Sequence, residues 1–368
     1  MAMNNTAVGT IAREFNMKGF LVDTRPYGNG HINDTYLVRY NDGGKITKYI
    51  IQRINTDIFK DYEGLMNNIV GVTEFMRAKL NDLGRDGSRG ALTVIKTIRG
   101  KIFYIDGYGD VWRAFIFIDD AVSLDLPEDE NDFYQSAVAF GEFQRMLADY
   151  PAETLVESIP DFHNTPVRYE AFLKAVEADV CGRASGVEKE IEFVKSRREF
   201  MSVLMDSHAS GKLPLKVTHN DTKMNNVMLD KDTREPVCVV DLDTIMPGFS
   251  VNDFGDSIRF GASTAAEDEK DLNLVHFSIN MFETYTRGFL KGCAGSLTEA
   301  ELDLLPEGAK MMTLECGMRF LTDYLSGDTY FKTAYKEHNL VRCRTQFKLV
   351  SEMEEQWDNM KKIVSKYK

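Results

Sequence analysis

A short polar stretch of the chain carries the residue types that phosphoryl transfer needs. It runs from His219 to Asn226 and holds a carboxylate at Asp221 and a cation at Lys223. A second carboxylate, Asp241, follows Asn226 by fifteen residues at the end of an apolar run. Asp221 could orient and deprotonate a hydroxyl, Lys223 could neutralise the moving phosphate, and Asn226 and Asp241 could bind Mg²⁺. The stretch therefore predicts an enzyme that transfers a phosphoryl group.

The spacing within this stretch is that of a kinase catalytic loop. His219, Asp221 and Asn226 match the pattern H-x-D-x-x-x-x-N, and Lys223 has the offset of the lysine in many protein Ser/Thr kinases. A polar turn between two strands is the alternative, because Asn, Asp and Thr are common turn residues. The complete set favours the catalytic interpretation. We expect His219 to brace the loop through backbone hydrogen bonds rather than to carry protons.

The same stretch resembles a known family. The strings HNDTKMNNVMLD, VVDLDTIMPG and DFGDSIRFGA are similar to the aminoglycoside phosphotransferase and choline kinase superfamily, and within it to the N-acetylhexosamine 1-kinases. Further similar blocks are YGNGHINDTYLV, YIIQRIN, FGEFQRML, IPDFHNTPVR and MRFLTDYLSGDTYF, so the resemblance runs from about residue 20 to residue 350. It implies an α+β, two-lobed, protein-kinase-like fold with a β-rich N-terminal lobe and a mainly helical C-terminal lobe.

The expected metal ligands are hard oxygen donors, which suit Mg²⁺. Asn226 and Asp241 are the first choice, whereas Asp243 could either form a hydrogen bond behind the metal or touch a second ion. Asp253-Phe254-Gly255 spells the metal motif of protein kinases, but it lies 27 residues after Asn226. Asp241 has the better spacing, so we expect Asp241 to bind metal and Asp253 to brace a loop.

The expected nucleotide-binding residues lie in the first third of the chain. Gly28, Asn29 and Gly30 lie between two strand-like runs, and glycine lets backbone N–H groups approach phosphate oxygens closely. One such turn is also typical of a plain hairpin, but it lies where the family has its phosphate-covering loop. The resemblance further places the interlobe hinge at the end of the run 114–118, which puts Phe117 and Asp119 beside the adenine of ATP.

The third strand-like run, Lys48–Ile54, departs from the kinase pattern V-A-I-K. Its aligned residue is Gln52, which is neutral, and the neighbouring cation is Arg53. Successive strand residues point to opposite faces, so only one of the two can enter the site unless the strand bulges. The helix carboxylate that pairs with the kinase lysine has two candidates, Glu63 and Glu74.

The acceptor assignment depends on the resemblance. It implies that ATP, with Mg²⁺, phosphorylates the anomeric hydroxyl of GlcNAc or GalNAc, and that Asp221, Arg319 and Tyr330 contact the sugar. Without the resemblance, Arg319 and Tyr330 would be interpreted as helix-surface and core residues. An aminoglycoside or other small-alcohol kinase is the second possibility. A nucleotide-binding pseudokinase is the third, and only Gln52 supports it.

The composition of the chain restricts the classes of molecule that we expect it to bind. The formal net charge of −13 argues against binding nucleic acid, although an acidic surface could still attract a cationic substrate. The five cysteines are scattered and lack metal spacing, which is typical of reduced thiols in a cytoplasmic protein. No apolar run approaches about eighteen residues, so we expect no membrane partner.

The elements that must position these residues follow from hydrophobic patterning. Phe59–Leu80 is helix-like, and apolar residues recur at helical spacing from Asn131 onward, with a short β-rich insertion around the catalytic loop. The strand-like runs are Gly19–Tyr27, Thr35–Tyr40, Lys48–Ile54, Leu92–Ile98, Lys101–Ile105 and Val111–Ile118. This order predicts a nucleotide-binding lobe over 1–118 and a lobe over 119–368 with the catalytic loop, the metal site and the sugar pocket.

Overall fold

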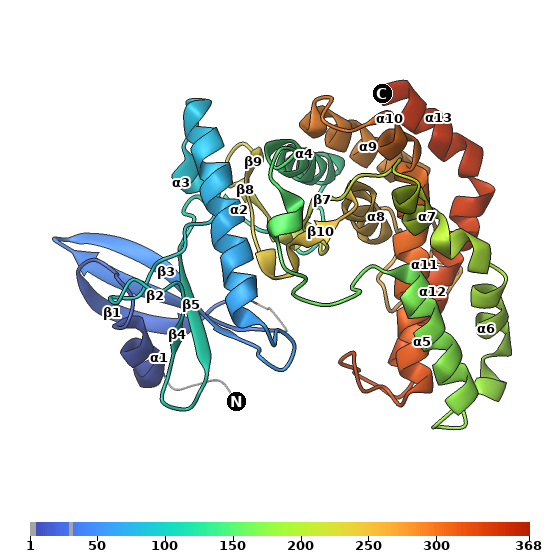
Figure 1. Ribbon diagram of the computed structural model, residues 1–368, viewed down its shortest axis with the longest axis horizontal. Coiled ribbons are helices and arrows are strands. Elements are labelled where there is room, and N and C mark those ends of the chain that lie inside the picture. Colours follow the sequence, from blue (N-terminus) through green and yellow to red (C-terminus); the bar gives the residue numbers. More distant parts are fainter. Residues whose placement is uncertain (1–4, 29–31) are drawn as a thin grey trace.

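The chain folds into a β-sheet region followed by a mainly helical region. The computed structural model describes residues 5–28 and 32–368. In Figure 1 the sheet lies at one end, the long helix α2 (Tyr62–Asp82) stands beside it, and the C-terminal helices form the other end. Asp61 begins α2, since its side chain accepts a hydrogen bond from the Gly64 N–H. The arrangement confirms the predicted fold class.

The N-terminal sheet has five antiparallel strands in the order β1-β2-β3-β5-β4. Three predicted strand runs correspond closely to β1, β2 and β3, and β5 lies within a fourth. The strands are β1 (Phe20–Pro26), β2 (Asp34–Asp42), β3 (Lys45–Ile54), β4 (Tyr104–Ile105) and β5 (Val111–Ile116). The register pairs Gln52 of β3 with Arg113 of β5, so these two side chains share one face of the sheet.

One predicted strand is not a regular strand. The segment Leu92–Ile98 follows β5 through two backbone hydrogen bonds, from Ile95 N to Ala114 O and from Ile116 N to Thr93 O. It then turns to form an isolated bridge between Thr97 and Phe15. Because the segment pairs in turn with β5 and with the residues after α1 (Asn5–Ala12), it makes only isolated bridges.

The helical region contains the remaining elements. Its strands are β6 (Ala121–Val122), β7 (Lys216–Thr218), β8 (Val227–Asp230), β9 (Pro236–Val239) and β10 (Met246–Gly248). Its helices are α4 (Glu130–Met146), α5 (Thr165–Ala178), α6 (Glu188–Lys195), α7 (Val203–Ala209), α8 (Ser250–Gly261), α9 (Ile279–Cys293), α10 (Glu299–Asp303), α11 (Leu305–Leu325), α12 (His338–Glu355) and α13 (Trp357–Tyr367). The short helix α3 (Gly87–Gly90) precedes β4.

Two helices of this region meet through glycines. A Cβ atom added to Gly255 of α8 would lie 2.2 Å from the carbonyl oxygen of Gly308 in α11, and one added to Gly308 would lie 2.2 Å from that of Val251. No side chain fits at either position, so both residues must be glycine for the two backbones to approach this closely. This contact fixes α8 beneath the catalytic loop.

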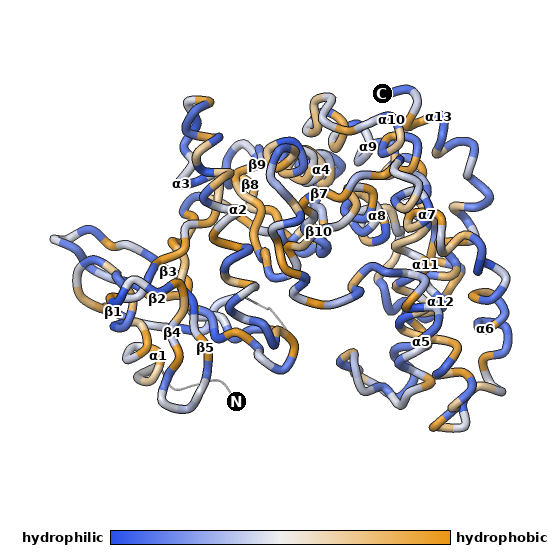
Figure 2. Tube along the Cα trace, in the orientation of Figure 1, coloured by the Kyte–Doolittle hydropathy of each residue, from blue (hydrophilic) through white to orange (hydrophobic). Residues whose placement is uncertain are grey.

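The core crosses the boundary between the two regions. One cluster of buried side chains includes Ile54 and Phe115 from the sheet, Leu65 from α2, and Phe143 and Val239 from the helical region. A separate cluster packs α1 against the outer face of the sheet. Figure 2 shows hydrophobic stretches along β3, β8 and β9, whereas the peripheral helix α6 is mostly hydrophilic.

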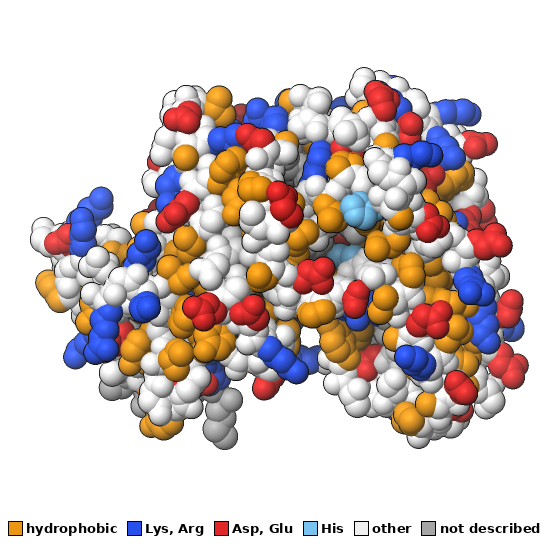
Figure 3. Space-filling model, in the orientation of Figure 1, with side chains coloured by type: hydrophobic (Ala, Val, Ile, Leu, Met, Phe, Trp, Pro, Cys, Tyr) orange, Lys and Arg blue, Asp and Glu red, His pale blue; other side chains and the backbone are white. Residues whose placement is uncertain are grey.

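Charged side chains of both signs share the surface that Figure 3 shows. On the face visible in Figure 3, Lys and Arg side chains are interspersed with Asp and Glu, without a broad basic area. None of the described helices has the length and apolar character of a membrane-spanning segment. All five cysteines are free thiols, namely Cys181, Cys238, Cys293, Cys316 and Cys343.

Candidate active site

Two antiparallel strand pairs bring the catalytic loop and the metal loop together. β7 pairs with β10, with Thr218 opposite Met246, and β8 pairs with β9, with Val227 opposite Val239. The catalytic loop, residues 219–226, leads from β7 to β8, and the metal loop, residues 240–245, leads from β9 to β10. Since both loops close the same two strand pairs, they lie side by side although they are distant in sequence.

Three predicted site residues of the catalytic loop, Asp221, Lys223 and Asn226, form one cluster. Lys223 Nζ lies 2.8 Å from Asp221 Oδ1, and Asn226 Nδ2 donates to the Asp221 carbonyl oxygen at 2.8 Å. Burial disfavours the charge on Lys223, but the Asp221 carboxylate outweighs this effect, and the pKa of the Lys223 ammonium is raised. Lys223 therefore remains a cation beside Asp221.

Helix α8 holds the catalytic loop from below. Asp253 is buried and accepts the backbone N–H groups of His219 and Asn220 at 2.9 and 2.8 Å. Asp256, one turn later, accepts the Thr222 N–H at 3.0 Å. These bonds engage both oxygens of Asp253, so its contacts in the structure are those of a residue that braces a loop.

His219 connects the catalytic loop to the metal loop. Its Nε2 lies 2.9 Å from the Val240 carbonyl oxygen, and its Nδ1 accepts the Asp221 N–H at 3.3 Å. This pattern places the proton on Nε2 of a neutral ring. Thr244 Oγ1 donates to the His219 carbonyl oxygen at 2.7 Å, which adds a second link. The contacts of His219 are those of a structural residue, as the sequence predicts.

Asp241 projects from the turn that ends β9. Its backbone is left-handed, with a φ of 60°, a conformation that Asp tolerates better than most residues. Although Asp241 remains accessible to solvent, desolvation by the surrounding protein, followed by the charges of Asp243 and Asp221, raises the pKa of its carboxyl group to about 6. Crowded negative charge of this kind favours a bound cation.

Asp243 faces the sheet. Its two oxygens accept hydrogen bonds from Arg113 Nη1 on β5 and from Asn33 Nδ2 before β2, both at 2.5 Å. The Asp243 side chain is buried between these partners. Of the two roles that the sequence left open, this geometry favours hydrogen bonding behind the metal over contact with a second ion.

Strand β3 shows which of Gln52 and Arg53 faces the metal loop. Gln52 Oε1 accepts from Arg113 Nε at 2.9 Å, so Gln52 lies on the cleft face of the sheet. Arg53 lies on the other face, where it pairs with Asp34 and Asp110. The nucleotide-binding prediction for Arg53 is therefore corrected, because its guanidinium is committed away from the cleft. Both candidate helix carboxylates, Glu63 and Glu74, are exposed, and neither forms an ion pair within the described residues.

The structure describes three of the other predicted nucleotide contacts, Gly28, Phe117 and Asp119. Gly28 borders a hollow of about 150 Å³ that Asn33 and Thr35 also line, whereas Asn29 and Gly30 lie outside the described residues. The Phe117 N–H donates to the Lys48 carbonyl oxygen at 3.1 Å, so it is not available to an adenine edge. Asp119 is exposed and pairs with Lys48 Nζ at 2.5 Å. A nucleotide contact by Phe117 or Asp119 would therefore use atoms of these residues that do not already have these partners.

The predicted sugar-binding residues Arg319 and Tyr330 lie in and after α11, and His163, before α5, connects this helix to the catalytic loop. His163 lies 2.8 Å from buried Glu315 and 3.4 Å from the Asn220 carbonyl oxygen. One turn after Glu315, the Arg319 guanidinium lies between the rings of Phe162 and Tyr330, at 5.3 and 5.8 Å from their centroids. The structure therefore brings Arg319 and Tyr330 together, and His163 links this group to the loop that carries Asp221.

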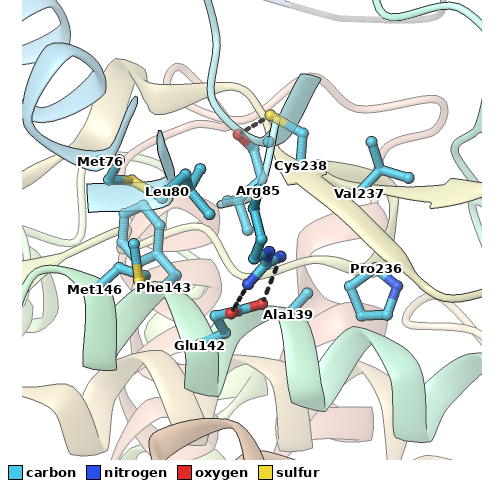
Figure 4. A pocket seen from close by; sticks show the side chains of 12 residues that line it. Met76, Leu80, Arg85, Ala139, Glu142, Phe143, Met146, Pro236, Val237 and Cys238 are labelled. Atoms are coloured by element: carbon cyan, nitrogen blue, oxygen red, sulfur yellow. Dashed lines mark hydrogen bonds and ion pairs between the residues drawn. The ribbon is translucent and has the colours of Figure 1, made fainter. Parts of the chain in front are cut away.

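A cavity elsewhere in the molecule is separate from this site. It lies between α2, α4 and β9, behind the sheet, and it is lined by Met76, Leu80 and Phe143 (Figure 4). An ion pair between Arg85 and Glu142 crosses it. With a volume of about 30 Å³ the cavity is too small for a nucleotide or a sugar, and it contains none of the predicted site residues.

Comparison with known proteins decides the family. The chain matches the phosphotransferase enzyme family, APH, over residues 23–286, which is more than half of its length. The chain belongs to this family. Its fold is similar to that of a microcompartment-associated aminopropanol kinase, with a TM-score of 0.56, 14% identity and coverage of 97% of this chain and 98% of that chain.

Two further structures share the fold of this phosphotransferase. One is the spectinomycin phosphotransferase APH(9)-Ia in complex with ADP and spectinomycin, with a TM-score of 0.57, 11% identity and coverage of 97% and 99% of the two chains. The other is a choline kinase from Cryptosporidium parvum Iowa II, with a TM-score of 0.57, 12% identity and coverage of 98% and 99%. At these identities the likeness establishes the fold and leaves the acceptor open.

The residues of this phosphotransferase fit a Mg²⁺ ion. No group of three His, Cys, Asp or Glu side chains in the described ranges is arranged to hold a metal. Mg²⁺ does not need one, because it keeps several waters and takes further oxygens from substrate phosphates. Asn226 donates its amide to Asp221, which leaves the carbonyl oxygen for an ion, and Asp241 supplies a carboxylate in a crowded negative environment.

Some residues of the site were not predicted from the sequence. Arg113 is the clearest case, although it is the single charged residue within the apolar run 111–118, a signal that could have identified it. Asp256 is another, and its position three residues after Asp253 places both on one helix face. Asn33 has no comparable signal, because its role depends on a contact with Asp243, which is 210 residues away.

Proposed function

We propose that this phosphotransferase transfers the γ-phosphate of ATP to the anomeric hydroxyl of an N-acetylhexosamine, GlcNAc or GalNAc. The observation that supports the proposal is that Arg319 and Tyr330, which the resemblance assigns to the sugar, lie together. His163 connects Glu315, one turn before Arg319, to the Asn220 carbonyl oxygen in the loop that carries Asp221. The expected cytoplasmic location, based on the free cysteines, is part of the same proposal.

Each residue of the catalytic cluster has a defined role in this reaction. Asp221 accepts the proton of the sugar hydroxyl as its oxygen attacks the γ-phosphorus. Lys223, within 2.8 Å of Asp221, neutralises negative charge on the transferred group. Asn226 and Asp241 hold Mg²⁺, which when bound neutralises charge on the phosphate oxygens. His219, Asp253 and Asp256 keep the two loops in place through backbone hydrogen bonds.

The charge of the acceptor wall favours a sugar over an aminoglycoside. Arg168 donates to the Phe162 carbonyl oxygen at 3.2 Å, and within the described ranges neither Arg168 nor Arg319 forms an ion pair with a carboxylate. Burial, followed by the positive charge of Arg319, lowers the pKa of the Arg168 guanidinium. Two close guanidinium groups would repel a polycationic antibiotic, whereas they can donate to hydroxyl and acetamido oxygens.

A substrate panel tests the acceptor. Purified protein is incubated with ATP, Mg²⁺ and either GlcNAc, GalNAc, glucose or kanamycin, and the product is followed by ³¹P and ¹H NMR, which identifies the phosphorylated hydroxyl. We expect a sugar 1-phosphate from an N-acetylhexosamine and little product from kanamycin. Phosphorylation of the aminoglycoside alone would replace the proposal by the second possibility. The absence of transfer despite nucleotide binding would favour a pseudokinase.

Two substitutions test the sugar pocket. Arg319→Ala and Tyr330→Phe each remove a donor to the sugar, at a cost of about 1–3 kcal/mol, so the KM for N-acetylhexosamine should rise roughly 5- to 150-fold. The KM for ATP should change little, because the triphosphate is held by other residues. Tyr108→Phe, at an exposed tyrosine on a turn of the sheet region, is the matched control. A change confined to ATP would instead place these residues at the nucleotide.

A further inference from the structure

The most deeply buried ion pair of the described chain joins its two regions. Arg113 on β5 and Asp243 in the metal loop are only 1% and 5% exposed, and Nη1 lies 2.5 Å from Oδ1. Stability alone does not explain such a pair. Removing two charges from water costs about as much as their attraction returns, and an apolar pair of similar volume is often as stable. A role in positioning is the alternative explanation.

The pair belongs to a network that spans three strands. Arg113 Nε donates to Gln52 Oε1 at 2.9 Å, and Gln52 Nε2 donates to Thr35 Oγ1 at 3.0 Å. Asn33, which closes the β1–β2 loop, donates to the second oxygen of Asp243 at 2.5 Å. One carboxylate is thus held both by the sheet and by the end of the phosphate-covering loop. Its orientation is fixed from two sides.

This network lies where kinases have a different charge pair. In protein kinases a strand lysine pairs with a helix glutamate, and both must be in place for phosphoryl transfer. Here the strand residue Gln52 is neutral, and the helix candidates Glu63 and Glu74 are exposed. The cation comes instead from β5, and its partner is part of the metal loop. The Arg113–Asp243 pair therefore joins the sheet directly to the metal loop.

The geometry points to Arg113 as a positioning residue that acts through Asp243 on Asp241. The inference rests on the proposed Mg²⁺-dependent phosphoryl transfer. It concerns the residue that fixes the geometry of the metal site. Asp241 lies two residues before Asp243 in a left-handed conformation, with His219 holding the Val240 carbonyl oxygen on its other side. Arg113 fixes the far end of this short segment. Its loss leaves the Asp241 carboxylate without a defined position.

Binding of Mg·ADP compared with adenosine tests this role by calorimetry. Adenosine lacks phosphates and needs no metal, so its affinity does not depend on the metal loop. Arg113→Met should weaken Mg·ADP binding roughly 10- to 150-fold, the range for loss of a hydrogen bond to a charged group, and leave adenosine binding within about twofold. Arg53→Met, which removes a cation from the outer face of the same sheet, should change neither affinity. A parallel loss of adenosine, or an unchanged affinity for Mg·ADP, would overturn the inference.

A double variant separates positioning from stability. Arg113→Met alone leaves the Asp243 charge buried and unpaired, which should lower the melting temperature. Arg113→Met with Asp243→Leu replaces the ion pair by an apolar pair, so the melting temperature should recover while Mg·ADP affinity stays low. Recovery of Mg·ADP affinity in the double variant would show that the pair is only structural. If the single variant does not fold, the double variant and Arg113→Lys carry the test, and Arg113→Lys should lose less affinity in the same direction.

These measurements do not depend on the acceptor. If the wild-type protein binds Mg·ADP but phosphorylates no sugar, the proposed acceptor fails and the role of Arg113 is still tested. If sugar phosphorylation is found and Arg113→Met binds Mg·ADP as the wild type does, only the positioning inference fails.

Discussion

At the scale of single residues, Asp221 is the group on which the reaction depends. Asp221→Asn keeps the shape of the side chain but removes the proton acceptor, so we expect kcat to fall by about 10²- to 10⁴-fold. Mg·ADP binding should change little, because Asn226 and Asp241 remain. Steady-state kinetics and calorimetry measure the two quantities. A variant that keeps more than about a tenth of the wild-type kcat would contradict the role of Asp221 as the base.

Asp241 links metal binding to pH. Its folded-state pKa of about 6 is above the usual 3.8, so between about pH 4 and pH 6 the metal-free folded protein binds a proton that the unfolded chain releases. The contribution of Asp241 to stability is therefore favourable at low pH and is lost as the pH rises through about 6. Mg²⁺ competes with this proton, so nucleotide binding should weaken below about pH 6.

Asp241→Asn tests this balance. At pH 7.5 in EDTA the neutral amide relieves the crowded negative charge, so the melting temperature should rise by a few degrees, about 2–4 °C per kcal/mol for a chain of this size. Near pH 4.5, where wild-type Asp241 is already protonated, the difference should shrink. Mg²⁺-dependent nucleotide binding should be lost at every pH. A variant that is less stable than the wild type in EDTA at pH 7.5 would mean that Asp241 is a structural residue.

Residue types and spacing were enough to group the residues of the catalytic loop, but they did not show which residue of the sheet faces the metal loop. Asp221, Lys223 and Asn226 are close in sequence, so their cluster follows from local spacing, and the structure brings Asp241 beside them. The alternation of strand side chains correctly limited the cleft to either Gln52 or Arg53, but it could not choose between them. That choice depends on which face of the sheet meets the metal loop, which is a property of tertiary packing.

At the scale of elements, local sequence pattern is again insufficient where the outcome depends on tertiary packing. The runs that became β1, β2 and β3 carry their own signal in alternating side chains and glycine turns, and they were predicted within a few residues. The run Leu92–Ile98 has a similar local signal but forms only isolated bridges, because it divides its pairing between β5 and Phe15. Local pattern specifies an extended chain, whereas regular pairing depends on the partner that the fold supplies.

The close contact of α8 and α11 gives a prediction at this scale. Gly255→Ala places a methyl group 2.2 Å from the Gly308 carbonyl oxygen, so α8 must shift, at a cost of about 1–3 kcal/mol. Since Asp253 and Asp256 hold the catalytic loop from α8, kcat should also fall. Gly186→Ala, at an exposed glycine with no neighbour within 4 Å and no left-handed conformation, is the matched control. Equal melting temperatures for the two variants would contradict the tight contact.

At the scale of the whole molecule, the predicted division at residue 118 does not coincide with a division of the core. The buried cluster that contains Leu65 of α2 also contains Phe143 of α4 and Val239 of β9. Buried Asn68 of α2 adds polar links, since its amide donates to the carbonyl oxygens of Val156 and Ile245 at 2.8 and 3.1 Å. Helix α2 is therefore as much a part of the helical region as of the sheet region.

Because the sheet region and the helical region share one core, we expect them to unfold together. We expect the full chain to unfold in one transition in differential scanning calorimetry, with equal calorimetric and van't Hoff enthalpies. A fragment of residues 1–118 should not fold alone, because the face of α2 that carries Leu65, Met66 and Ile69 would lose its partners and be exposed to water. Two resolved transitions, or a fragment with dispersed NMR signals, would show instead that the sheet region is an independent domain. In that case the Arg113–Asp243 pair would join two separately stable parts, and its loss would open the cleft without lowering the stability of either.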